Sequence, residues 1–88
     1  MVPIEYDIII FQEDETYVAY CPELDISSCG NSVEHAENML KTAVRLFLEE
    51  AEKMGTVEEI LEESRYKKNE SGKWLPPKIV RTELVSTL

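Results

Sequence analysis

The segment between Ser32 and Gly55 most constrains the fold of this chain, because it has the pattern of one long amphipathic helix. Ser32 is a good N-cap, with Asn31 as the competing choice, and Gly55 is suited to end the helix in a left-handed conformation. Glu34 lies in the first turn, where the helix dipole favours an acid. The apolar side chains that share one side at 100° per residue are Val33, Ala36, Leu40, Ala43, Val44, Phe47, Ala51 and Met54. Such a helix needs a second layer to cover its apolar side.

Three short strands are predicted before this helix, from their alternating pattern and their content of β-branched and aromatic residues. A polar, acidic turn over residues 12–16 joins the first two into an antiparallel hairpin. Pro22 ends the second strand because it has no N–H to donate, and Gly30 permits a tight turn from the third strand into the helix. The predicted strands are Val2–Phe11, Tyr17–Cys21 and Leu24–Cys29.

A second helix and a last strand are predicted after Gly55. Thr56 and Glu59 have the spacing of a capping box, so we expect a short helix from Thr56 to about Arg65. Residues 67–73 are a charged loop, and residues 74–77 are extended because they lead into two prolines. Ile79–Leu88 has the pattern of a final strand with apolar residues on both faces.

The predicted order β-β-β-α-α-β indicates an α+β fold of two layers, in which a three-stranded antiparallel meander is covered by the long helix. With 88 residues the chain is expected to form a single domain, in which residues 1–55 are the core and residues 56–88 add the short helix, the loop and the C-terminal strand. The last strand can add beside the first, parallel to it, or add to the sheet of a neighbouring subunit.

The net charge of −9 is carried entirely by the first part of the chain, because residues 1–40 contain nine acids and no Lys or Arg. An acidic surface repels phosphate, so direct nucleic-acid binding by this part is not expected. It would attract a basic partner, although solubility alone also explains such a charge. The candidate partner-binding residues are Glu5, Asp7, Glu13, Asp14, Glu15, Glu23 and Asp25.

The residues that usually carry chemistry are few. His35 is the only histidine and is expected at the surface, while Cys21 and Cys29 are expected as reduced, partly buried thiols unless they are cross-strand neighbours. One His and two Cys are too few for a closed zinc site. The acids are interpreted as a solvated edge, with a Mg²⁺ site as the alternative. We therefore predict no catalytic residue, no metal, no cofactor and no enzymatic activity.

No apolar run is long enough to cross a membrane. Residues 1–10 carry Glu5 and Asp7 and no Lys or Arg, so we do not expect a secretory signal. We expect a cytoplasmic location.

Pro22-Glu23-Leu24 ends a strand with aromatic residues, and Gly30-x-Ser32 follows before a helix with Glu34 and Ala36 in its first turns. In this order and spacing, from about Ile4 to Leu48, the chain resembles the HicB-like antitoxin family. That family has an aromatic strand ending in Pro-Asp/Glu-Leu, a short strand, Gly-x-Thr/Ser, and a helix with Glu and Ala in its first turns. Asp25 and Ile26 depart from this pattern, which commonly has Pro-Gly there, and His35 stands where a second Glu is frequent. The residues that fill the pattern are Pro22, Glu23, Leu24, Gly30, Ser32, Glu34 and Ala36.

The resemblance implies a partial RNase H-like fold without working catalytic acids. It also implies that the chain is the antitoxin of a small basic HicA-type toxin that cleaves mRNA, and that it acts by covering the toxin's active surface. Full-length members often carry a DNA-binding segment, but residues 56–88 have too few helices for one, so no direct DNA binding is expected from this chain alone. The alternative is a divergent stand-alone domain that binds another protein or a small ligand.

A homodimer is expected from the apolar C-terminal part of the chain. A strand with apolar residues on both faces needs cover on both, and one helix layer covers only one. Met39 and Leu46 lie together on a flank of the long helix, where packing at the edge of the core is the alternative to a subunit contact. The tail can also add to its own sheet instead of a partner's. The candidate interface residues are Met39, Leu46, Trp74, Ile79, Val80, Leu84 and Val85.

Overall fold

The long helix α1 spans Val33–Met54 in the structure, a computed structural model that describes residues 2–88. The Ser32 hydroxyl accepts a hydrogen bond from the His35 amide at 3.0 Å, and Gly55 adopts a left-handed conformation with φ 71°. The amides of Gly55 and Thr56 donate to the carbonyls of Glu52 and Ala51, which closes the last turn as a Schellman motif. The predicted helix and both of its ends are confirmed.

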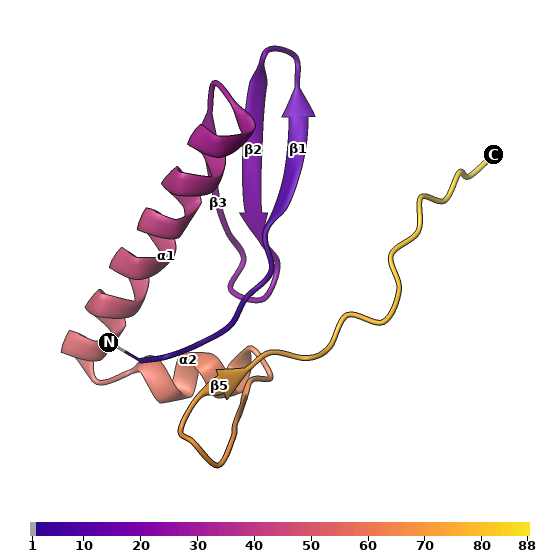
Figure 1. Cartoon of the computed structure of the whole chain (residues 1–88). Coiled ribbons are helices and arrows are strands. Elements are labelled where there is room, and N and C mark those ends of the chain that lie inside the picture. Colours follow the sequence, from indigo (N-terminus) through magenta and orange to yellow (C-terminus); the bar gives the residue numbers. More distant parts are fainter. Residues whose placement is uncertain (1) are drawn as a thin grey trace.

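Three antiparallel strands precede α1 in a meander of order β1-β2-β3. In the register, Ile10 lies opposite Ala19 and Val18 lies opposite Cys29. α1 covers one face of this sheet and packs mainly on β2 and β3 (Figure 1). The strands are β1 (Ile9–Glu13), β2 (Thr16–Cys21) and β3 (Ile26–Gly30). The α+β class and the three-stranded meander are as predicted.

The first core cluster lies between the sheet and α1, and Ala19 and Cys21 supply its sheet side. From the helix, Leu48 enters this core, whereas Phe47, which the helical periodicity placed on the buried side, is 37% exposed. Val33 and Met54 at the helix ends are exposed as well. The buried members are Ala19, Cys21, Ala36, Leu40, Val44 and Leu48.

Gly30 brings β3 and α1 close together. Its φ is not in the left-handed region, so the turn does not require glycine for its conformation. A Cβ at this position would instead lie 2.6 Å from the backbone nitrogen of Ala36 and 2.9 Å from the carbonyl carbon of His35. The missing side chain therefore allows the helix to begin directly against the strand.

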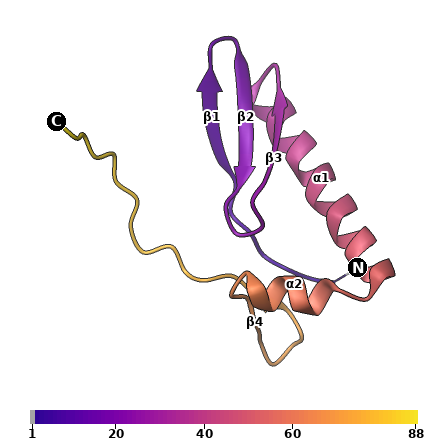
Figure 2. The same ribbon diagram turned by 180° about the vertical axis from the view of Figure 1, so that it is seen from behind.

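The short helix α2 spans Val57–Glu63 and follows α1 after Gly55 (Figure 2). The predicted capping box is wrong, because the Thr56 side chain makes no capping hydrogen bond to α2. Its hydroxyl instead donates to the Ala51 carbonyl at 3.5 Å, so the Thr56 side chain bonds the last turn of α1.

A second small sheet holds the two ends of the domain together. β4 (Lys67–Lys68) pairs with β5 (Trp74–Leu75), so the predicted charged loop is a short hairpin. On the other side of β5, Trp74 forms a parallel bridge with Ile4. The Trp74 amide donates to the Pro3 carbonyl at 3.0 Å, and the Glu5 amide donates to the Trp74 carbonyl at 3.1 Å.

The second core cluster lies beneath this small sheet and consists of Leu61, Tyr66 and Trp74, with Val2 and Ile4 packed against it. The predicted first strand is corrected accordingly. The regular strand begins only at Ile9. Before it, Val2 and Ile4 pack against this second cluster, whereas Tyr6 and Ile8 pack against the first.

The predicted strand Ile79–Leu88 is wrong for the single chain, because residues 76–88 form no helix or strand. The expected parallel pairing beside the N-terminal segment occurs at Trp74 instead, and Pro76 and Pro77, which lack an N–H, end it there. Residues 78–88, here called the arm, run away from the domain on the side opposite α1 (Figure 1). The radius of gyration is accordingly 14.7 Å, against about 12 Å for a compact domain of this length.

No helix among residues 2–88 has both the length and the apolar character to cross a membrane.

Candidate protein-docking surface

The face of the three-stranded sheet that points away from α1 is the open sheet face. Side chains alternate along a strand, and because Ile10, Ala19 and Cys21 pack towards α1, their neighbours point the other way. Phe11 is the most exposed large apolar side chain of this sheet, at 49%. The apolar residues and the thiol of the open sheet face are Ile9, Phe11, Val18, Tyr20 and Cys29.

Three of the predicted acids form the tip of the β1–β2 hairpin. Glu13 ends β1, and Asp14 and Glu15 make the turn, where Asp14 has a left-handed backbone with φ 57°. All three are exposed, and the Gln12 side-chain amide donates to the Asp14 carbonyl at 3.4 Å. The hairpin tip, Glu13–Glu15, therefore presents three carboxylates to solvent.

Glu23 is at the opposite end of the sheet, in the turn that leads from β2 to β3. Its two carboxylate oxygens accept hydrogen bonds from the Asp7 amide at 3.1 and 3.3 Å, and the Cys21 thiol donates to one of them at 3.6 Å. Partial burial, and then the neighbouring Asp7, raise the pKa of Glu23. The folded state therefore favours the protonated form, and this contribution to stability is lost as the pH rises through the raised pKa.

The other acids at this end are also engaged within the chain. Lys73 Nζ lies 2.6 Å from Glu5 Oε2, and the Tyr20 hydroxyl donates to Asp25 Oδ1 at 2.9 Å. This hydrogen bond raises the pKa of the Tyr20 hydroxyl. A carboxylate that already accepts from the protein has less capacity for a new partner.

The seven candidate acids thus divide into two groups. Thr16 and Cys21 bound β2, so the hairpin tip and the Glu23 turn are separated by about 16 Å of strand. The structure does not bring the seven together into one patch. Among residues 2–88, no three His, Cys, Asp or Glu side chains converge as ligands for a metal ion.

The two cysteines lie in different environments. Cys21 is fully buried against α1, and burial raises the pKa of its thiol to about 11. Cys29 is exposed on the open sheet face and pairs with Val18, not with Cys21. The cross-strand geometry that a disulfide needs is absent, and both cysteines are free, although only Cys21 is buried as expected.

His35 is exposed, as predicted, and closes the loop before α1. Its Nδ1 lies 3.1 Å from the backbone nitrogen of Asn31 and 3.0 Å from the Asn31 side-chain oxygen. The ring therefore supports the start of the helix.

The residues proposed for a dimer interface lie in three different places. Met39 and Leu46 are exposed on α1, whereas Trp74 is buried in its own chain's second core cluster. Ile79, Val80, Leu84 and Val85 are exposed on the arm.

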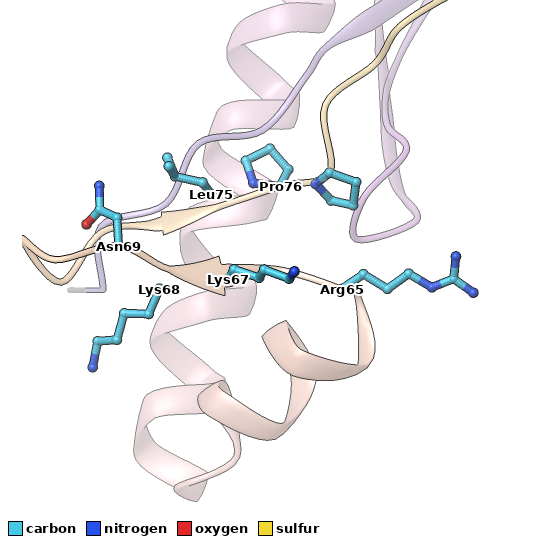
Figure 3. Close-up of a pocket in the computed structure, with 7 residues that line it drawn as sticks. Arg65, Lys67, Lys68, Asn69, Leu75 and Pro76 are labelled. Carbon is cyan, nitrogen blue, oxygen red and sulfur yellow. The ribbon is translucent and has the colours of Figure 1, made fainter.

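Sequence reasoning missed a basic hollow of about 560 Å³ beside the β4–β5 hairpin. Arg65, Lys67 and Lys68 line it together with Leu75 and the two prolines. In Figure 3 the Lys67 and Lys68 side chains leave β4 in different directions, and the Lys68 ammonium lies 5.6 Å from the Trp74 ring centroid. The run of basic residues in the sequence was visible, but its placement beside Pro76 and Pro77 depends on the hairpin.

Comparison of the chain with protein-family models, with curated proteins and with solved structures gives no match.

Proposed function

We propose that this protein is an antitoxin-like protein-binding module of the HicB-like kind, with a partial RNase H-like sheet and no catalytic activity of its own. Its partner would be a small basic HicA-type toxin that cleaves mRNA. The module would neutralise the toxin by covering its active surface, with carboxylates placed where the RNA phosphates otherwise bind.

The observation that carries this proposal is the hairpin tip. Glu13, Asp14 and Glu15 are exposed at the end of the β1–β2 ladder, and residues 1–40 contain no Lys or Arg to neutralise them. The open sheet face beside the tip presents Phe11, an aromatic residue of the type enriched at protein interfaces. An acidic rim beside an apolar patch suits a basic protein surface.

Co-expression of the chain with the product of the adjacent gene tests the proposal. We expect a small basic protein to co-purify with the affinity-tagged chain, and its growth arrest to be relieved by co-expression. If the neighbouring product is not retained and its toxicity is unchanged, the antitoxin assignment is wrong, and binding of another protein or of a small ligand becomes the better explanation.

Charge reversal at the hairpin tip tests the surface. Glu13→Lys with Glu15→Lys should weaken toxin binding by about tenfold or more at low salt, which corresponds to about 1.4 kcal/mol. The loss should shrink in about 0.5 M salt, where exposed charges are screened. The matched control is Glu62→Lys with Glu63→Lys on α2, which makes the same change in net charge at exposed positions away from the sheet. An equal loss in both variants would show that only the net charge matters.

A further inference from the structure

The arm has the composition of a strand but has no strand partner. Its β-branched residues favour extended pairing, and Val80, Leu84 and Leu88 share one face if it is extended. Val80 is 88% exposed, and Leu84 and Leu88 are fully exposed. An apolar segment of this kind is stable in water only when another surface covers it.

The chain as a whole exposes more surface than a protein of its size should. Its accessible area is 6682 Å² for a mass of 10.1 kDa, which is about 1,400 Å² more than the scaling for compact monomers gives. A standard protein interface buries about 800 Å² on each partner. The excess is therefore large enough to form a stable dimer interface.

The three-stranded sheet offers a free acceptor at β1. Among residues 2–88, β1 pairs with β2 alone and is, like β3, an edge of the sheet, and α1 packs mainly on β2 and β3. Its outer backbone N–H and C=O groups can therefore receive another strand. Acids flank it at both ends, with Asp7 before it and the hairpin tip after it.

The charges of the arm complement this acceptor. Lys78 and Arg81 are the first charged residues of the arm, and the only acid that follows is Glu83, which is 3.0 Å from Arg81 Nη1. Because β1 has carboxylates at both ends, Lys78 and Arg81 would lie near carboxylates whether the arm runs parallel or antiparallel to β1.

The arm's own β1 is a poor acceptor, because the two prolines interrupt the ladder that begins at the Ile4–Trp74 bridge. Neither Pro76 nor Pro77 can donate to the N-terminal segment. Arm residues as far as Thr82 line one hollow with Ile9 and Glu23, but they form no strand there, and the end of the arm lies away from the sheet (Figure 2). Two consecutive prolines restrict the backbone and direct the arm outward, which favours its pairing with a second copy of the chain.

We propose that two copies of this chain exchange arms, so that residues 79–88 of each copy add as a strand to the free edge of β1 in the other. This interaction differs from the toxin proposal in its partner and in its hydrogen bonds, which form at the edge of β1, although the basic residues of the arm can also meet the hairpin tip.

Sedimentation equilibrium of the full chain tests the exchange. We expect a species of twice the 10.1 kDa chain mass at micromolar concentration. Val80→Asp with Leu84→Asp should convert it to a monomer that keeps the helical signal in far-UV circular dichroism, since these side chains lie outside both core clusters. The control is Leu46→Asp on the exposed flank of α1, which should remain dimeric.

Hydrogen exchange identifies the acceptor. Amides of Ile9–Glu13 should be better protected in the dimer than after dilution or in the Val80→Asp, Leu84→Asp variant, whereas those of Ile26–Gly30 should not change. A monomer throughout, a dimer that survives the arm substitutions, or protection of β1 that does not depend on concentration would each overturn the proposal.

Discussion

At the scale of single residues, the two thiols should react very differently. Cys29 is exposed, so it should react with a thiol reagent such as DTNB at pH 8 in the folded protein. Cys21 is buried with a pKa of about 11, so roughly one molecule in a thousand would carry the reactive thiolate at that pH, even with access.

Counting released thiolate checks this prediction. One equivalent should appear quickly and the second only after denaturant is added. Cys29→Ser should abolish the fast phase, and fast reaction of both thiols would show that β2 and α1 do not pack as described. Both cysteines were predicted on strands from the sequence. Which face of the sheet each one occupies could be told only from the register, in which Cys29 lies opposite Val18.

The acids show a similar limit of sequence reasoning. Their one-sided distribution was visible, and the exposed hairpin tip could be expected from its turn-like composition. The Lys73–Glu5 ion pair could not, because it joins residues 68 apart through the second small sheet. Likewise, the partner of Glu23 is a backbone amide of residue 7, which no side-chain pattern reveals.

At the scale of elements, the contact between β3 and α1 should be sensitive to one methyl group. Gly30→Ala would place a Cβ within 3 Å of the backbone of His35 and Ala36, and backbone atoms cannot move aside as a flexible side chain can. We expect a loss of about 1–3 kcal/mol in the free energy of unfolding.

Urea denaturation measures this loss, with Ser27→Ala on the exposed side of the same strand as the control. That control should change stability by less than about 0.5 kcal/mol. If Gly30→Ala is as stable as the control, the close approach of helix and strand is not tight.

The elements differ in how far local sequence determined them. α1 was predicted with its true ends because Ser32 and Gly55 each make the cap that their residue type favours. Thr56 was misassigned because its hydroxyl has two possible helix ends within reach, and the carbonyl of Ala51 at the end of α1 is the one it bonds. β1 was predicted to begin too early because Ile4 has the alternation of a strand but pairs with Trp74.

At the scale of the whole molecule, the fold should not require the arm. Neither core cluster contains a residue beyond Trp74. A chain ending at Pro77 should therefore retain the helical content of the full chain. At concentrations too low for association, its free energy of unfolding should lie within about 0.5 kcal/mol of the full chain's.

The dependence of the free energy of unfolding on protein concentration gives a further check. The stability of the full chain should rise with protein concentration if arms are exchanged, and that of the shortened chain should not. Loss of helical content on shortening would mean that the arm belongs to the fold of the single chain. From sequence, the apolar tail was predicted to need a partner surface, and its separation from the sheet depends on Pro76 and Pro77.

The bridge between Ile4 and Trp74 also sets an order of events during synthesis. β1–β3 and α1 are all present once Gly55 has left the ribosome, so the first core cluster can close early. The second cluster cannot, because the Tyr66 hydroxyl that bonds the Glu5 carbonyl is 61 residues further along the chain. Until Trp74 emerges, the segment around Ile4 remains without its pairing partner. Translation therefore completes the domain from the sheet towards the small hairpin, and the segment around Ile4, which is made before the sheet, is fixed in place after it.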